Sequence, residues 1–418
     1  MRRFLLLGLA AITSFVVISG GCKRAAVESP KNDRQSPAIR VSREGTDAAE
    51  PAIVADGAGN IAVAYVEHSG DLADLYVQKY DANGKISSDR VRVNPVAGEV
   101  RAWKGDPPTI AVGKDERVYV GWTRAYTAAN AKGSDLVLSV SSNGGLSFGA
   151  PVKINDDEKP ASHGMHSLAV DDKGHIFAAW LDERDIKFED HETKAAAAMM
   201  HYEEIEPNSE VFYSFSDDGG ETFAANKKIA SESCPCCKTA LLAASDGMVY
   251  ISWRQVLKDD YRHIAVAHSN DGGKTFSEGT VVSDDKWQLF ACPVAGAALA
   301  SSAPQTLDVL WYTAGTAGPE GLYQARSADG GKSFGARTLI DDKASASTPV
   351  ILMIRGKATA LFTGADDQVF SRSLDEPTGN PLVVTDGTAP AAIISSGRTI
   401  VAIVRKATAK SEVWLLAG

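Results

Sequence analysis

The dominant pattern along the chain is a pair of short apolar runs separated by a polar turn. In "PTIAVGKDERVYVGW" the two runs flank the turn "GKDER", and the second run ends at Trp122. Runs of this length with a turn between them predict two antiparallel β-strands. The pattern recurs, and the second run ends in turn at Tyr65, Trp122, Trp180, Trp253, Trp311, Phe362 and Val404. Such a period predicts a fold built from repeated all-β units.

A second repeat, S-x-[DN]-x-G-x-[ST]-F, follows the paired runs at four places. Its Asp or Asn side chain can accept hydrogen bonds from backbone N–H groups ahead of it, and its glycines tolerate positive φ. Each copy therefore predicts a tight turn between two further strands, with the closing Phe packed inward. The copies begin at Ser141, Ser216, Ser269 and Ser327.

These turns resemble the Asp-box, or BNR repeat, of the sialidase superfamily. The resemblance implies a β-propeller in which each such turn joins the third and fourth strands of a blade, away from the active site. Candidate fourth strands lie at 91–94, 152–155, 227–230, 280–283, 337–340 and 382–385. The segment 38–42 resembles the missing fourth strand of the last blade, which would close the ring and remove its exposed edges. We predict a single sialidase-like β-propeller of four-stranded blades at 38–418, with seven blades favoured and six as the alternative.

The first residues carry an export pattern. Two arginines precede the apolar run "FLLLGLAAITSFVVIS", which ends at "GGC". A charged start, an apolar middle and small residues before a cut site predict a signal peptide, and a transmembrane anchor is the alternative. The ending resembles a bacterial lipoprotein signal, which implies removal of residues 1–21, acylation of Cys22 and, with Lys23 next, anchoring to the outer membrane. Residues 22–37 are polar and unpatterned, and they predict a flexible tether.

Composition and charge narrow the choice of partners. A hydrophobic content of 44% is enough for a sizeable core, and the net charge of −10 argues against binding to nucleic acid or to an anionic membrane surface. We expect a monomer whose membrane contact is its lipid anchor, either in the periplasm or at the cell surface.

The propeller prediction also places separate segments on one face. The loop entering the first strand of a blade and the loop leaving its second strand open at the same end of the channel, where functional sites collect. The entry loops of three consecutive blades supply His163, Met165 and His166, then Cys234, Cys236 and Cys237, then Cys292. The second-strand exits supply Arg124, Asp182, Glu183, Arg184, Arg254 and Tyr312. A long insertion at 182–210 predicts a short helix that either closes over the site or only plugs the channel mouth.

One interpretation is glycosidase chemistry. Sialidases hold a substrate carboxylate with three arginines and use a Tyr activated by Glu as nucleophile and an Asp as acid/base. The resemblance implies those roles for Arg124, Arg184 and Arg254, with Asp182 or Glu183 as acid/base and Tyr312 as nucleophile. Tyr202 beside Glu203 is the alternative nucleophile. The first blade reads "AEPAIVAD" and lacks the arginine that sialidases carry there. Surface or inter-blade ion pairs are the alternative for each arginine.

A second interpretation is a copper or zinc site, because thiolates and imidazoles suit both ions and a thioether favours copper. Its candidate ligands are His163, Met165, His166, Cys234, Cys236, Cys237 and Cys292. A third is structural: in an oxidising compartment Cys234 or Cys237 could be joined to Cys292, or Cys236 to Cys237.

A wider resemblance covers residues 160–340. The C-x-C-C motif, the arginine after the paired second strand and "ACPVAG" one blade on look like a branch of bacterial sialidase-superfamily propellers with no settled activity.

The sequence thus predicts an exported lipoprotein that binds or hydrolyses a carbohydrate or other small anionic ligand. The alternatives are a periplasmic copper- or zinc-binding protein and a non-catalytic, disulfide-stabilised scaffold.

Overall fold

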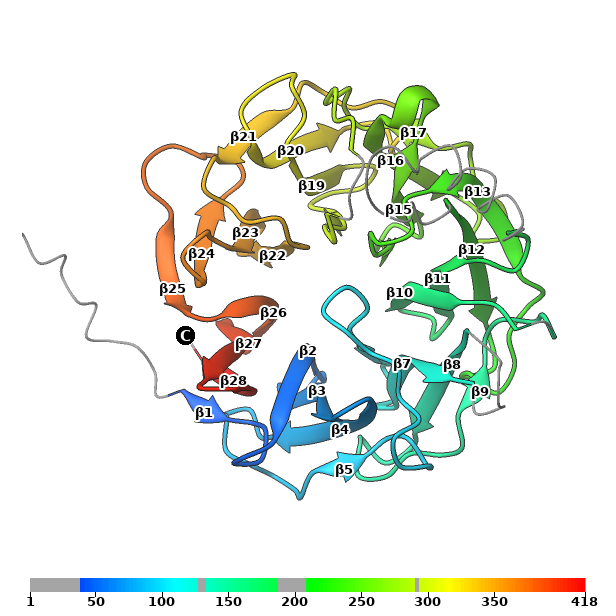
Figure 1. Ribbon diagram of the computed structural model, residues 1–418, viewed down its shortest axis with the longest axis vertical. Helices are drawn as coiled ribbons and strands as arrows, with labels where there is room; N and C mark the ends of the chain where they lie inside the picture. The colour runs from blue at the N-terminus through cyan, green and yellow to red at the C-terminus, as the bar shows by residue number, and fades with distance from the viewer. Residues whose placement is uncertain (1–37, 127–132, 159, 187–207, 290–292, 418) are drawn as a thin grey trace, which may run out of the picture. The chain divides into compact units, whose positions relative to one another are not determined.

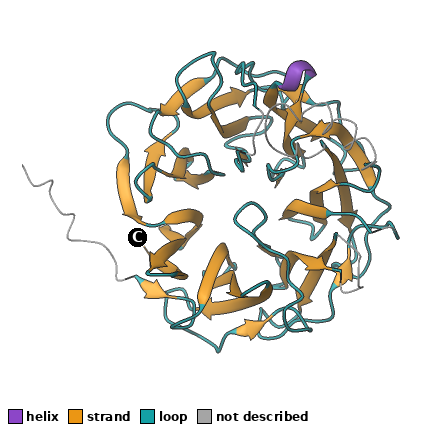
Figure 2. Ribbon diagram, in the orientation of Figure 1, coloured by secondary structure: helices purple, strands orange, loops and turns teal. Residues whose placement is uncertain are grey.

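The computed structural model describes residues 38–126, 133–158, 160–186, 208–289 and 293–417. Within these ranges the regular structure is β-strand, apart from one short 3-10 turn at Lys258–Asp260 (Figure 2). The all-β prediction is therefore confirmed. No helix in the described ranges is long and apolar enough to cross a membrane. The predicted signal peptide, Cys22, the tether, Cys292 and most of the 182–210 insertion lie outside the described residues.

The described strands pair antiparallel in sets of four, which we call blades one to seven in chain order. Blade one is formed by β2 (Asp47–Ala55), β3 (Ile61–Ser69), β4 (Leu72–Tyr80) and β5 (Val91–Arg92). Blade two is formed by β6 (Thr109–Val112), β7 (Val118–Ala125), β8 (Ser134–Ser141) and β9 (Val152–Lys153). Blade three is formed by β10 (His163–Val170), β11 (Ile176–Asp182), β12 (Ser209–Ser216) and β13 (Lys227–Ser233). Blades four and five are β14 (Ala240–Ala243), β15 (Val249–Val256), β16 (Arg262–Ser269), β17 (Thr280–Val281); and β18 (Ala298–Ala300), β19 (Leu307–Thr313), β20 (Gly321–Ser327), β21 (Thr338–Asp341). Blades six and seven are β22 (Val350–Ile354), β23 (Lys357–Thr363), β24 (Gln368–Ser373), β25 (Leu382–Asp386); and β26 (Thr388–Ser395), β27 (Arg398–Ala407), β28 (Lys410–Ala417) with β1 (Ile39–Arg40).

The first strand of each blade contacts the first strand of the next, from β2 through β6, β10, β14, β18, β22 and β26 back to β2 (Figure 1). β1 pairs with β28 through Ile39↔Leu415 and Arg40↔Trp414. That pairing is the one that closure of the last blade by an N-terminal strand requires. Blades three and four are also linked by the single pair Ser233↔Gln255 between β13 and β15.

The four Asp-box turns have the predicted chemistry. In the copy after β16, the carboxylate of Asp271 accepts the backbone N–H groups of Lys274 and Thr275, both at 2.9 Å. The backbone N–H of Gly273 donates to Ser269 Oγ at 2.9 Å, and Gly273 has a φ of 81°, which a side chain would strain. The closing residues Phe148, Phe223, Phe276 and Phe334 pack against the apolar core. Local hydrogen bonding therefore explains why this motif recurs.

Apolar clusters lie between neighbouring blades and form the core. Trp122, Trp180, Trp253 and Trp311, near the ends of the second strands, are at most 2% exposed, and each donates its indole N–H to a side-chain oxygen. The cluster between blades three and four contains Trp253, Met165 and the three cysteines Cys234, Cys236 and Cys237. The C-x-C-C motif is therefore part of the core between two blades.

Candidate functional site

The three cysteines lie in the connection from β13 to β14, which is the predicted entry loop of blade four. The backbone N–H of Cys234 donates to the carbonyl of Arg254 on β15 at 2.8 Å, and that of Cys237 donates to Cys234 O at 3.4 Å. The first bond ties the loop to the second strand of its own blade, and the second closes a turn. The turn gathers the three sulfur atoms on one side, and all three residues are at most 3% exposed.

The three sulfur atoms lie within 4.8 Å of one another. Cys234 Sγ is 3.6 Å from Cys236 Sγ and 3.7 Å from Cys237 Sγ. A disulfide needs about 2.05 Å, so these cysteines are free thiols in the structure. The predicted bonds to Cys292 involve a residue outside the described ranges and stay predictions.

Arginine charge surrounds this cluster. Arg262 Nη1, at the start of β16, lies 3.1 Å from Cys234 Sγ. Hydrogen bonds from the other two thiols, aided by the charges of Arg262 and Arg254, lower the pKa of Cys234 despite its burial. The pKa of Cys236 is raised because its proton is shared with Cys234, and that of Cys237 is raised mainly by burial. The cluster therefore favours one thiolate held by two thiols and a guanidinium.

The predicted histidine ligands have other partners. His163 Nδ1 lies 2.7 Å from Ser134 O, and His163 Nε2 lies 3.0 Å from Asp157 Oδ1. His166 Nδ1 lies 2.9 Å from Asp106 Oδ1. β10 is irregular here, with a register shift between Gly164 and Ser167, but the shift leads the two imidazoles to different carboxylates. Among the described residues, the group able to share one metal ion is formed by the three cysteines.

Met165 differs from the two histidines because it packs in the same apolar cluster as the cysteines. Its φ of 52° is unusual for a residue with a side chain and belongs to the same irregular stretch of β10. Its carbonyl accepts both the N–H and the hydroxyl of Thr239, at 3.0 Å each. The entry strands of blades three and four are thereby fixed to each other beside the sulfur atoms.

Asp106 is a buried residue that sequence reasoning did not single out. It precedes β6, and its carboxylate also accepts the hydroxyl of Thr123 at 2.7 Å. Burial alone would raise the pKa of Asp106, but the charge and hydrogen bond of His166, with Lys238 nearby, lower it to about 2. No repeat marks this position, so only the three-dimensional arrangement reveals the Asp106–His166 pair.

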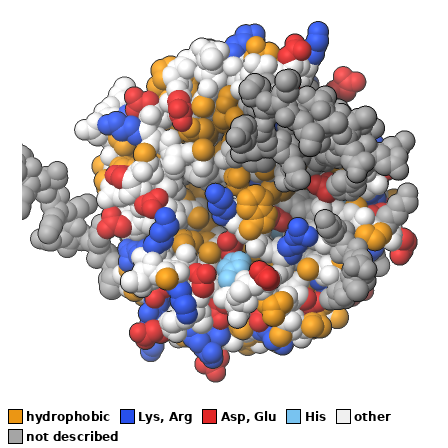
Figure 3. Space-filling model, in the orientation of Figure 1, with side chains coloured by type: hydrophobic (Ala, Val, Ile, Leu, Met, Phe, Trp, Pro, Cys, Tyr) orange, Lys and Arg blue, Asp and Glu red, His pale blue; other side chains and the backbone are white. Residues whose placement is uncertain are grey.

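Two of the arginines predicted to bind a carboxylate are occupied by carboxylates of the protein itself. Arg124 Nη2 donates to Asp135 Oδ2 at 3.1 Å, a residue on the neighbouring strand β8. Arg184 contacts Asp182 through Nε and Nη2 and Asp156 through Nη1, at 2.6 to 3.0 Å. On the face seen in Figure 3, basic and acidic side chains are interspersed in the same way. These arginines form separate ion pairs rather than one cationic cluster.

The predicted acid/base residues are placed differently from each other. Asp182 is fully buried and also accepts the indole N–H of Trp180 at 2.8 Å, so it ties the end of β11 together. Glu183 is half-buried, and its backbone N–H donates to Ser162 O at 3.1 Å. The contacts of Asp182 are therefore those of a residue that stabilises the fold, because its carboxylate is buried and bonded to Trp180 and Arg184.

Arg254 and Tyr312 lie together between blades four and five. Arg254 Nη2 donates to the carbonyls of Ala295 and Tyr312, at 2.8 and 3.0 Å, and its guanidinium lies 4.7 Å from the ring centre of Trp287. The hydroxyl of Tyr312 donates to the carboxylate of Glu320. Burial and this hydrogen bond raise the pKa of Tyr312. Glu320 was not predicted, because it follows an irregular loop with no repeat pattern.

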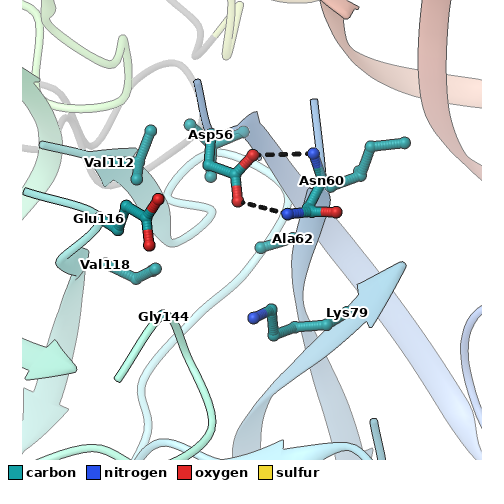
Figure 4. A pocket seen from close by; sticks show the side chains of 10 residues that line it. Asp56, Asn60, Ala62, Lys79, Val112, Glu116, Val118 and Gly144 are labelled. Carbon is teal, nitrogen blue, oxygen red and sulfur yellow. Dashed lines mark hydrogen bonds between the residues drawn. The ribbon is translucent and has the colours of Figure 1, made fainter. Parts of the chain in front are cut away.

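Two cavities lie at the Asp-box ends of the blades, away from the cysteines. One, of about 20 Å³, lies between blades one and two, and there Asp56 accepts two hydrogen bonds from Asn60 (Figure 4). The other, of about 600 Å³, lies between blades three and four and is lined by the turn after β14 and the Asp-box after β16. Neither is lined by a predicted site residue.

Comparison with known proteins gives structural matches only. No protein-family model matches the chain, and no curated protein does. A protein of unknown function from Dyadobacter fermentans is 14% identical over 92% of this chain and 98% of its own, with a TM-score of 0.51. The polysaccharide lyase Uly1 is 11% identical over 88% and 89%, with a TM-score of 0.53. The Hadza microbial sialidase Hz136 is 14% identical over 84% and 74%, with a TM-score of 0.49. At such identities a likeness extends to the fold alone. The four-stranded sheets of the described residues agree with the propeller predicted from the Asp-box turns.

Proposed function

We propose that the protein binds a thiophilic metal ion through Cys234, Cys236 and Cys237. The observation that carries this proposal is the gathering of three buried sulfur atoms within 4.8 Å. A metal–sulfur bond of about 2.3 Å places sulfur ligands of one ion about 3.7 to 4.0 Å apart. The two distances from Cys234 Sγ, 3.6 and 3.7 Å, fit that range with small side-chain movements.

The surroundings of the sulfur atoms support the same proposal. Thiolates are soft ligands that select Cu(I), zinc and iron–sulfur clusters over hard oxygen-binding ions. The cysteine loop is anchored to β15 through Arg254 O, so the ligands need little ordering when an ion binds. On binding, the two sulfurs that are still thiols release their protons to solvent, and all three form sulfur–metal bonds as thiolates.

Metal titration of the purified protein under anaerobic, reducing conditions tests this function. We expect one equivalent of Cu(I) or zinc to bind the wild-type chain. Replacing all three cysteines by serine should weaken metal binding by more than about 100-fold. Losing a residue that only hydrogen-bonds to a metal ligand already weakens binding by about 10- to 100-fold, and losing the ligands themselves should weaken it more. Met165→Leu is the matched control, since it keeps an apolar side chain in the same cluster and should retain binding. A wild-type chain that binds no metal would refute the proposal.

A carbohydrate ligand is the second candidate, and the Tyr312–Glu320 pair favours it. A tyrosine next to a glutamate is the nucleophile arrangement that the sialidase resemblance implies, and the chain shares its fold with a polysaccharide lyase. In this function Glu320 would accept the phenolic proton as Tyr312 attacks the sugar. This candidate comes second because Arg124 and Arg184 are paired with carboxylates of the protein itself.

Turnover of an aryl sialoside and a panel of other aryl glycosides tests the second candidate. Tyr312→Phe should lower the rate of any turnover at least about 100-fold, because the nucleophile is lost. Tyr323→Phe is the control: this tyrosine is on the same blade and its hydroxyl only donates to Pro319 O at 2.6 Å. Equal activity in wild type and Tyr312→Phe, or no turnover at all, would rule out hydrolysis at this pair.

A further inference from the structure

Two arginines beside the cysteines carry buried charge that no carboxylate in the described residues balances. Arg254 is 0% exposed, and its Nε and Nη1 have no hydrogen-bond partner in the described part of the chain. Arg262 is 5% exposed, and its Nε is unpartnered within the same ranges. Burying such donors without partners costs free energy, so their retention calls for an explanation.

Both arginines contact the cysteine loop. Arg262 Nη1 lies 3.1 Å from Cys234 Sγ, and the backbone carbonyl of Arg254 accepts the N–H of Cys234 at 2.8 Å. Trp287 contacts both arginines: the Arg254 guanidinium faces its ring, and its carbonyl accepts the N–H of Arg262. The two aspartates just before it in the chain have cations of their own, since Asp285 pairs with Arg337 and Asp284 with Lys286. Within the described ranges, neither arginine forms an ion pair with a carboxylate, and the nearest anionic group to the Arg262 guanidinium is the sulfur of Cys234.

We propose, on the basis of the metal-binding function proposed above, that this site selects a monovalent thiophilic ion, Cu(I), over divalent zinc. Three thiolates and one monovalent cation leave two negative charges, which the two guanidinium groups neutralise. With a divalent ion at the same three thiolates, one positive charge stays uncompensated. Burying an uncompensated charge is unfavourable, so charge balance favours the monovalent ion at this site.

The ligand set also suits Cu(I). The three cysteines form the group able to share an ion among the described residues, and Cu(I) prefers soft sulfur ligands. Arg254 and Arg262 are thus positioning and specificity-determining residues, which act on the ion through the cysteines.

Competition titrations with Cu(I) and zinc against chromophoric chelators test this inference, on wild type and on Arg262→Gln, Arg262→Lys and Cys292→Ser. Wild type should prefer Cu(I). Arg262→Gln should lower Cu(I) affinity by about 10- to 100-fold, the usual effect of losing an outer partner of a metal ligand, and should leave zinc affinity equal or higher. Arg262→Lys keeps the charge and should restore most of the preference. Circular dichroism shows whether each variant is folded, and Arg254→Gln provides a second test if Arg262→Gln is not.

The outcomes separate the two proposals. If neither ion binds wild type, the proposed function fails and this inference fails with it. If one ion binds through the three cysteines but zinc is preferred, or Arg262→Gln changes both affinities equally, metal binding survives and the charge-selection inference is overturned. Loss of metal in Cys292→Ser would indicate a four-cysteine zinc site and would also overturn it. Retention of Cu(I) by that variant supports the three-cysteine site.

Discussion

Replacing Trp253 by alanine is expected to lower the free energy of unfolding by about 3–5 kcal/mol, because a buried indole is lost and a cavity is left. Trp253 is 2% exposed and packs in the cluster that contains Cys234, Cys236 and Cys237. Its indole N–H also donates to Gln255 Oε1 at 2.8 Å, so the acceptor loses a partner. We further expect the cysteine loop to loosen and metal affinity to fall by about 10- to 100-fold.

Trp122→Ala is the matched control for this prediction. Trp122 is 1% exposed, lies in the second strand of blade two and donates its indole N–H to Ser139 Oγ at 3.0 Å. It packs between blades one and two, in a cluster without cysteines. Chemical denaturation should give similar losses of stability in both variants, and metal titration should show weakened binding in Trp253→Ala alone. Equal metal binding in the two variants would mean that the inter-blade core does not position the sulfur atoms.

The fold was predictable because its signals are local and repeated. Trp122, Trp180, Trp253 and Trp311 close equivalent strands, and each is buried with its indole N–H bonded. The Asp-box turns likewise depend on hydrogen bonds that span only four residues, as from Asp271 to Thr275. Interactions between residues so close in sequence can be predicted from the sequence itself, and their repetition makes the pattern easy to recognise.

The candidate site was predictable in its cysteines and not in its surroundings. Cys234, Cys236 and Cys237 are near neighbours in sequence, so a single turn gathers them. Arg262 reaches Cys234 only because β15 and β16 form a hairpin whose register places the start of β16 beside that turn. Nothing in the segment "YRHIAV" marks this arginine as different from a surface residue.

The sequence left two roles open for each arginine, a carboxylate-binding site and an ion pair, and it could not name the partner residues for a related physical reason. Arg124 lies near the end of β7 and Arg184 lies just after β11, so both are at one end of their blades. Whether such an arginine is available to a ligand depends on the carboxylates that neighbouring strands present. Asp135 lies directly across from Arg124 in the β7–β8 register, and Asp156 belongs to the segment after β9 of the preceding blade. Those pairings are set by tertiary structure, in which most arginines find an acidic neighbour.

Removing the strand that completes blade seven should have the second large effect. A variant lacking residues 38–43 is expected to lose about 3–5 kcal/mol of stability, because buried apolar contacts and hydrogen bonds to β28 are lost together. Val41 is 7% exposed, and its backbone N–H donates to Val413 O at 2.8 Å. Ser42 Oγ accepts the backbone N–H of Val413 at 3.1 Å.

The same deletion should also change the association state, and this separates ring closure from a general loss of packing. Without β1, the strand β28 presents unpaired backbone groups along an edge, and such an edge pairs readily with another chain. Light scattering should therefore show concentration-dependent dimers or aggregates for the variant lacking 38–43. A variant lacking only residues 1–37 is the control, because it keeps the pairing of Ile39 and Arg40 with β28 and should remain monomeric. If the two variants unfold at the same denaturant concentration and both stay monomeric, β1 contributes nothing to closure, and the seventh blade must be stable with three strands.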